Sequence, residues 1–242
     1  EFKDDFEVTG HFYDLLAETE LFPCRSILEI DRKECRTKDV DLVVIMMNPG
    51  ASKPLDPNYI PEVATPNQIT NREWKKELIP TVPDSTQYQI MRLMLTLGAR
   101  KIRIFNLCDL RNPDSQTLKS DHVRAKQCDP KSTFSITSPD RIREVKKSIQ
   151  ESKIKSPMLG WGENRCLKEY ANEALLLFPR HFGVARNTPW FGHPSPRRKD
   201  QKLRWLDSLY DEILKHNQSE LSIPFARSSL TPCHSSPLAK KK

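Results

Sequence analysis

A short apolar run that stops abruptly, at residues 43–50, constrains the fold more than any other stretch of the chain. It reads Val-Val-Ile-Met-Met-Asn-Pro-Gly, so a hydrophobic segment passes directly into a turn sequence. A run with no polar face is typical of a strand buried on both sides, as in a parallel sheet covered by helices. In such sheets ligands bind beyond the carboxyl ends of the strands. Asn48 therefore stands where an α/β protein places its functional side chains.

Further strand and helix patterns alternate along the chain, which has 242 residues and is long enough for one domain with a sizeable core. Strands are predicted at residues 38–47, 101–107, 157–162 and 182–185, and helices at residues 84–98, 138–151, 163–178 and 200–216. This order predicts an α/β fold: a three-layer α/β/α sandwich with a central, mainly parallel four-stranded sheet, forming a single domain over residues 1–216.

The remaining segments carry weaker patterns. Apolar residues at roughly helical spacing predict a helix within residues 1–20, and residues 25–36 alternate as an edge strand would. Residues 51–86 are rich in proline, and a connection of this length after Asn48 is expected to be irregular and to cover a substrate. Residues 112–138 are polar and predict a loop or broken helix. Residues 217–242, rich in Ser, Pro and Lys, are expected to form a disordered basic tail.

Charge and cysteine content narrow the class of protein. The formal net charge of +7 favours a polyanionic partner, nucleic acid above all, although three lysines at the extreme C-terminus account for part of it. No apolar run approaches the roughly 20 residues that span a bilayer, and no secretory signal pattern is present, so we expect no membrane partner. The six cysteines lack zinc-finger spacing and indicate reduced thiols in an intracellular protein of the cytoplasm, nucleoid or nucleus. We expect a monomer without a cofactor or metal; an iron–sulfur cluster gathered by the fold is the alternative.

Four polar features follow predicted strands: Asn48, Asn106, the turn at residues 161–162, and His193. If the sheet is parallel, three of these strand ends share one edge. Each asparagine presents a donor and an acceptor, which suits reading a heterocycle edge or fixing a water molecule. The histidine can donate to a developing oxyanion. This convergence predicts a site.

Each of these residues also has a purely structural interpretation. Asn48 could close a turn, Asn106 could cap a strand end, and His193 could simply pack between neighbouring aromatics. The aromatic residues near these positions are expected in the core, as aromatics usually are; they are Trp161, Trp190 and Phe191. After the second strand, Asp109 and Arg111 could form a local ion pair or line the pocket.

Three of these segments, taken in order, resemble the signature motifs of the uracil-DNA glycosylase superfamily. They are residues 46–50 (MMNPG), 105–108 (FNLC) and 193–197 (HPSPR), and the similarity is closest to the single-strand-selective monofunctional uracil glycosylases. The resemblance spans residues 40–205, but only as short motifs. One tetrapeptide is weak evidence, whereas three in order at strand ends are stronger.

The resemblance implies roles for individual residues. Asn48 would orient the attacking water, and His193 would stabilise negative charge on the leaving base, so these two would be catalytic. Asn106 would read the Watson–Crick edge of the extruded base. The base-binding residues implied are Met47, Gly50, Asn106 and Tyr59, where Tyr59 is the first aromatic after the turn and would have to supply the stacking.

The third motif implies DNA contacts at Ser195, Arg197, Arg198 and Lys199. Arg197 would enter the duplex and hold the gap left by the flipped base, and the two residues after it would bind phosphates. A solvated helix start is the structural alternative for these cations. Residues 51–56 depart from the family pattern, and the first motif lacks the aspartate of the fastest branch, so activity is expected to be modest or absent.

The resemblance thus implies a monofunctional DNA glycosylase that hydrolyses the N-glycosidic bond of a flipped uracil or other deaminated base. The alternative is a non-catalytic nucleic-acid- or nucleotide-binding module with the same fold, and a weaker one is a hydrolase of free nucleosides. Residues 84–86, 106–115 and 161–162 are also similar to an uncharacterised bacterial and phage family, which implies no activity.

Overall fold

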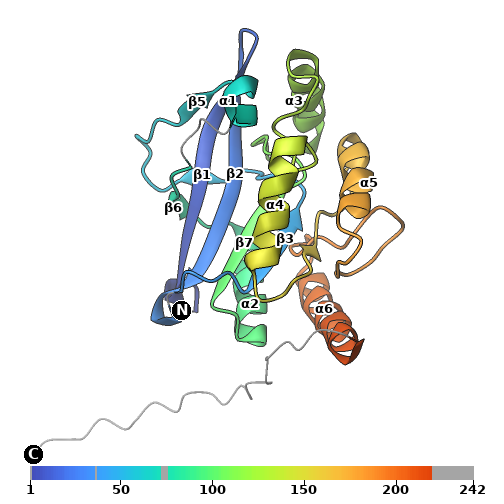
Figure 1. The fold of residues 1–242 in the computed structure, drawn as a ribbon. Helices are drawn as coiled ribbons and strands as arrows, with labels where there is room; N and C mark the ends of the chain where they lie inside the picture. Colours follow the sequence, from blue (N-terminus) through green and yellow to red (C-terminus); the bar gives the residue numbers. More distant parts are fainter. Residues whose placement is uncertain (1, 36, 72–75, 220–242) are drawn as a thin grey trace, which may run out of the picture.

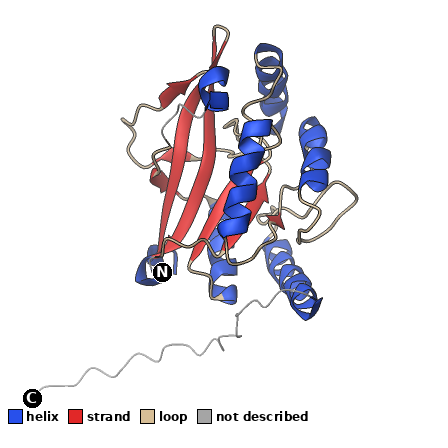
Figure 2. Cartoon of the chain, in the orientation of Figure 1, coloured by secondary structure: helices blue, strands red, loops and turns tan. Residues whose placement is uncertain are grey.

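The computed structural model describes residues 2–35, 37–71 and 76–219, and its fold is α/β with one mixed sheet (Figures 1 and 2). The eight strands follow the order β4-β6-β1-β2-β7-β3-β8, with β5 paired to β1 off this path. The strands are β1 (Phe6–Ala17), β2 (Glu20–Arg32), β3 (Leu42–Met46), β4 (Lys53–Pro54), β5 (Glu62–Ala64), β6 (Ile79–Val82), β7 (Lys101–Asn106) and β8 (Met158–Leu159). The α-helices are α1 (Pro66–Asn71), α2 (Ser85–Leu97), α3 (Ser115–Cys128), α4 (Pro139–Glu151), α5 (Lys168–Leu177) and α6 (Lys199–Ser219).

The predicted parallel strands form one half of the sheet. β3 pairs in parallel with β7 on one side and with β8 on the other. The fourth predicted strand, residues 182–185, contributes only a parallel bridge from Met158 to Phe182 and an antiparallel bridge from Ala185 to Phe191. The sheet is therefore larger and more mixed than the predicted four-stranded one.

Two predictions for the first 32 residues were wrong, although the strand expected from residue 25 is present as part of β2. The segment expected to be helical is the strand β1, and β2 lies inside the sheet between β1 and β7 rather than at its edge (Figure 1). The two strands form a long antiparallel hairpin, with Phe6 opposite Arg32 and Ala17 opposite Glu20. Buried residues of β1 recur at every second position, with Phe6 and Val8 on one face of the sheet and Tyr13, Leu15 and Ala17 on the other. This period-two burial overrides the loose helical spacing.

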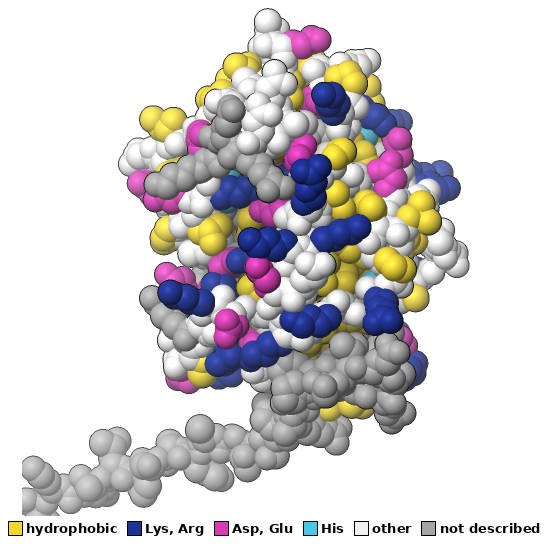
Figure 3. Space-filling model, in the orientation of Figure 1, with side chains coloured by type: hydrophobic (Ala, Val, Ile, Leu, Met, Phe, Trp, Pro, Cys, Tyr) yellow, Lys and Arg dark blue, Asp and Glu magenta, His cyan; other side chains and the backbone are white. Residues whose placement is uncertain are grey.

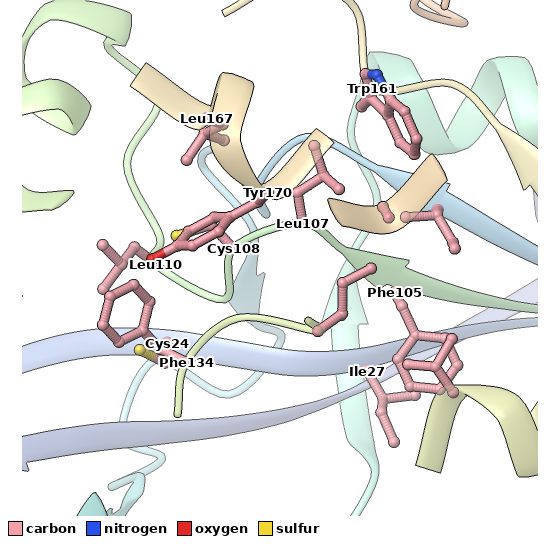
Figure 4. Packing of buried hydrophobic residues seen from close by; sticks show 14 of the residues in the cluster. Cys24, Ile27, Phe105, Leu107, Cys108, Leu110, Phe134, Trp161, Leu167 and Tyr170 are labelled. Carbon is pink, nitrogen blue, oxygen red and sulfur yellow. The ribbon is translucent and has the colours of Figure 1, made fainter. Parts of the chain in front are cut away.

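Helices pack on both faces of the sheet. On one face, buried residues of α4 and α5 join those of β1, β3 and β7, and Figure 4 shows part of this cluster around Phe105, Leu107 and Trp161. On the other face, α2 and α6 pack against β3 and β7 through a second cluster. Trp161, Trp190 and Phe191 are buried, as predicted for core residues.

Two segments predicted as irregular are more ordered than expected. Within residues 51–86, β5 and β6 join the edge of β1, and β4 pairs with β6. Pairing with the sheet holds these strands against β1, so the prediction of an irregular substrate-covering loop is wrong for them. Within residues 112–138, α3 is a continuous helix capped by Asp114.

Part of the C-terminal segment that was predicted as a tail lies outside the described residues. α6 runs to Ser219, past the predicted boundary at residue 216, and the rest of the expected tail lies outside the described residues. The five cysteines within those ranges have free thiols, and Cys233 lies outside them. None of the helices in the described part of the chain is long and apolar enough to cross a membrane.

Candidate functional site

A pocket of about 200 Å³ lies where β3 and β7 end, and it contains Asn48, Asn106 and His193 together. Backbone pairing continues beyond both strands, because Leu107 N–H donates to Met46 O and Cys108 N–H donates to the oxygen of Met47. The two asparagines are thereby carried to the same edge. The pocket is lined by Arg25, Leu28, Met46, Met47, Asn48, Pro49, Gly50, Asp84, Thr86, Gln87, Ile104, Asn106, Asn112, Pro113 and His193.

Asn48 is fixed by two hydrogen bonds to the loop that follows β7. Its Nδ2 donates to the carbonyl oxygen of Asn112 at 2.8 Å and to that of Leu110 at 3.2 Å. Both amide hydrogens are therefore used, and Oδ1 is the group that Asn48 can present to the pocket. This carboxamide oxygen can accept a hydrogen bond from a water molecule and hold it in place.

Asn106 is buried, with 1% of its surface exposed, and its Oδ1 accepts a hydrogen bond of 2.8 Å from Nη2 of Arg25. Arg25 was not identified from the sequence. It comes from β2, which runs antiparallel to β7 and so reaches the carboxyl end of β7 with its own first half. An arginine within the largely apolar stretch of residues 21–28 was the only signal.

A bulge in β2 aims Arg25 at the pocket. His11 pairs with Ile27 while Phe12 pairs with Arg25, so Ser26 is an extra residue in the strand. Without it, residues 25 and 27 would share a face. With it, Arg25 lies on the same side as Leu28, and both line the pocket. Bulges commonly redirect side chains in this way near functional sites.

His193 enters the pocket as a neutral donor. Its Nδ1 accepts a hydrogen bond of 3.1 Å from the backbone N–H of Ser195, so the ring proton resides on Nε2. Burial lowers the pKa of His193, against smaller opposing effects of the Ser195 hydrogen bond and of Asp84. The imidazole is therefore uncharged near neutral pH and offers Nε2–H to a ligand.

The turn at Gly162 positions His193 and is not among the pocket-lining residues. Gly162 has φ of +70°, and a Cβ there would lie 3.2 Å from Cβ of His193. The segment is held from both sides, because Gly162 N–H donates to Phe191 O and Trp205 Nε1–H donates to Gly192 O. The absence of a side chain at Gly162 therefore makes room for His193.

The amino-terminal end of α2 forms another wall of the pocket. Asp84 caps this helix by accepting from the backbone N–H groups of Thr86 and Gln87, and the Gln87 side chain accepts from Asp84 N–H in return. The helix itself was predicted, with its start at Asp84 and its end at Gly98. The cap brings a carboxylate into a pocket that also holds the guanidinium of Arg25.

Of the predicted base-binding residues, Met47 and Gly50 line the pocket and Tyr59 does not. The pKa of Tyr59 is raised mainly by burial and to a lesser extent by the charges of Glu77 and Glu62, which lie near its ring. The expected stacking aromatic is thus not supplied by Tyr59.

The predicted DNA-binding residues lie beside the pocket, at the start of α6. Ser195 Oγ donates to Ser85 Oγ at 3.3 Å, which ties this loop to the amino-terminal end of α2. Arg197, Arg198 and Lys199 are all exposed. Arg198 pairs with Asp200, so part of its charge is neutralised locally.

His193 also borders a second hollow of about 430 Å³, which includes Arg186 and Arg204. By contrast, the face that carries α4 shows Lys and Arg interspersed with Asp and Glu (Figure 3), in line with the pairs Arg143–Asp140 and Lys147–Glu151. Arg204 is paired with Asp200, so Arg186 is the better candidate in this hollow for a phosphate contact.

The two charged residues after β7 have structural roles on the far side of the strand end. Asp109 is fully buried and accepts hydrogen bonds from Tyr13 and Arg141. Burial raises the pKa of Asp109 to about 6, against the opposing effect of Arg141. Arg111 donates to Ser52 O and neither residue lines the pocket.

Among the described residues no three His, Cys, Asp or Glu side chains gather as a metal site requires. Comparison with known proteins adds no assignment, since no protein-family model, no curated protein and no solved structure matches this chain.

Proposed function

We propose that this protein is a DNA glycosylase of the uracil-DNA glycosylase type, which hydrolyses the N-glycosidic bond of a flipped uracil or other deaminated base. The observation that carries this proposal is the meeting of Asn48, Asn106 and His193, which are distant in sequence, in one small pocket at the ends of parallel strands. A pocket in this position is where α/β sheets bind their ligands.

The chemistry follows from the fixed orientation of each group. Asn48 Oδ1 accepts a hydrogen bond from a water molecule, whose oxygen bonds to the anomeric carbon of the sugar. The carbon–nitrogen bond breaks, and its electron pair leaves with the base. The water releases a proton to solvent, and the base anion takes up a proton from solvent, so that the products are the sugar alcohol and the neutral base. Nε2–H of His193 donates to the oxygen on which that negative charge gathers, and removing such a donor typically costs about 10²–10³-fold in rate.

The architecture supports the same proposal. β7, β3, β8 and the bridge at Phe182 lie side by side in parallel, with α2 and α6 on one face and α4 and α5 on the other. We take this half of the molecule as the α/β/α sandwich of the glycosylase type, extended by the β1–β2 hairpin.

Exposed cations near the pocket supply the expected DNA contacts. Arg186 lines the hollow that His193 borders, and Arg197 is exposed shortly after His193 in the chain, so these two can bind phosphates on either side of an extruded nucleotide. Extrusion of a base from the stack costs a few kcal/mol, which such contacts offset.

The test is base release from DNA. Oligonucleotides containing uracil, hypoxanthine or xanthine are incubated with the protein and treated with alkali, which breaks the strand at an abasic site. We expect strand breaks with at least one of them, and their loss in Asn48→Ala and His193→Ala proteins that remain folded. No breaks with any substrate, where a known glycosylase cuts all three, would refute the proposal.

The second candidate is a binding module with the same pocket and no bond cleavage. It is favoured by the position of Tyr59, because among the described residues no aromatic ring lines the pocket apart from that of His193. Salt-sensitive binding of DNA without release of any base would select this alternative.

A further inference from the structure

The guanidinium of Arg25 is a buried cation that no ion pair explains. Only 3% of Arg25 is exposed, and its Nε has no hydrogen-bond partner. Asp84 and Asp109 are close enough to favour its charge, yet within the described residues no carboxylate forms an ion pair with it. Burying a charge costs several kcal/mol unless partners compensate. A cation in the wall of a pocket, with donor capacity unused, points to a ligand that completes its contacts.

Arg25 also decides what Asn106 presents. Nη2 of Arg25 donates a hydrogen bond of 2.8 Å to Oδ1 of Asn106, and this bond fixes the carboxamide with its oxygen toward β2. Among the described residues Nδ2 of Asn106 has no hydrogen-bond partner, so it is the group left for a ligand. Without Arg25 the carboxamide could rotate and present either its donor or its acceptor.

Arg25, Asn106 and His193 together make a wall rich in donors. The hydrogens come from the guanidinium, from Nδ2 and from Nε2–H. Oδ1 of Asn106 has a second lone pair beside the one that Arg25 occupies, so the fixed carboxamide offers one donor and one acceptor in a set order. The other acceptors in the pocket are Oδ1 of Asn48, which we assign to water, the Thr86 hydroxyl, and Asp84, whose Oδ1 accepts from the backbone of its own helix.

We propose that Arg25 is a positioning residue that holds the Asn106 carboxamide in the orientation that pairs with a keto heterocycle and mispairs with the amino edge of cytosine or adenine. This inference rests on the proposed function, to which it adds the residue that sets the base preference. A keto heterocycle places a carbonyl oxygen against Nδ2–H and its ring N–H against Oδ1, whereas the amino edge sets donor against donor and acceptor against acceptor. Sites that hydrogen-bond one ring edge reject the wrong one because polar groups stay unpaired.

The experiment measures binding separately from cleavage. Affinities of the full chain for free uracil and free cytosine are determined by calorimetry, with hypoxanthine and adenine as a second pair. We expect the wild-type protein to prefer the keto member of each pair by about tenfold or more. In Arg25→Met the carboxamide of Asn106 is released, and the preference should fall to within about threefold.

Arg141→Met is the matched control. Arg141 is also buried, with 2% exposure, but it lies outside the pocket, so its removal disturbs the core and should leave the preference unchanged. Arg25→Lys serves if Arg25→Met does not fold: it keeps a charge, but one ammonium cannot replace the planar fork, and the preference should fall between the two values.

Each outcome decides the matter. A keto preference in the wild-type protein that drops in a folded Arg25 variant supports the inference, even if no DNA substrate is cleaved and the proposed function fails. A wild-type protein that binds cytosine as tightly as uracil, or binds neither, overturns it. A folded Arg25 variant with the wild-type preference also overturns it, because the arginine would then be structural only.

Discussion

The residue that best tests the geometry of the site is Gly162, because its missing side chain makes room for His193. Gly162 has φ of +70°, where a side chain costs about 1–2 kcal/mol. A Cβ would also lie 3.2 Å from Cβ and 3.6 Å from Cδ2 of His193. The imidazole must therefore shift by a few tenths of an ångström. Gly162→Ala is expected to lower Tm by roughly 2–8 °C from backbone strain alone.

Gly50 provides the comparison, since it has φ of +61° and a Cβ there would meet nothing within 4 Å. Gly50→Ala should show the same loss of stability by thermal unfolding but leave His193 in place. The position of His193 is read from the ¹⁵N shifts of its ring, which report the hydrogen bond from Ser195. We expect these shifts to change in Gly162→Ala and not in Gly50→Ala, and base release to fall roughly tenfold in Gly162→Ala. An unperturbed imidazole in a folded Gly162→Ala protein would refute the reasoning.

Three further predictions use groups with defined partners. Burial lowers the pKa of His193, so the contribution of this residue to stability is complete above about pH 6.5 and is lost as pH falls from there through the lower pKa of the folded state. Tm measured against pH should therefore be flatter in His193→Gln. Arg141→Met leaves Asp109 buried without its cation and should cost about 3–5 kcal/mol in urea unfolding, whereas a loss under about 1 kcal/mol would contradict the pairing. Arg197→Gln should reduce the slope of log affinity for DNA against log salt by about 1 without changing base preference, and an unchanged slope would exclude a phosphate contact.

The parts of the fold that sequence patterns predicted are those whose signals are local. β3 is a continuous apolar run, and α2 has both its capping box and its terminal Gly98, so each signal lies within one element. α4 begins at Pro139 as expected of proline in the first turn. These elements place Asn48 and Asn106, which is why the positions of both asparagines could be predicted.

The β1–β2 hairpin could not be predicted in the same way, because its pairing is non-local. β2 alternates well enough to be a strand, but nothing within residues 20–32 tells whether it has one neighbour or two. Residues 1–20 hold few apolar positions, and both faces of β1 are buried, so a period of 3.6 residues cannot be told from a period of 2. The helical interpretation of this segment failed for that reason. The bulge at Ser26 is likewise visible only once the register with β1 is known.

The functional groups of the site therefore come from two kinds of strand, parallel and antiparallel neighbours of β7. Parallel neighbours deliver residues that follow their last position, and these can be read from the sequence as polar residues after apolar runs. An antiparallel neighbour delivers residues from its first half: β2 pairs Leu28 with Ile104, so Arg25 comes to lie beside Asn106. The asparagine that was expected to read a base on its own is therefore set by a guanidinium from a strand that the sequence placed at the edge. Any assignment of substrate from the three motifs alone omits the group that fixes which atoms Asn106 can offer.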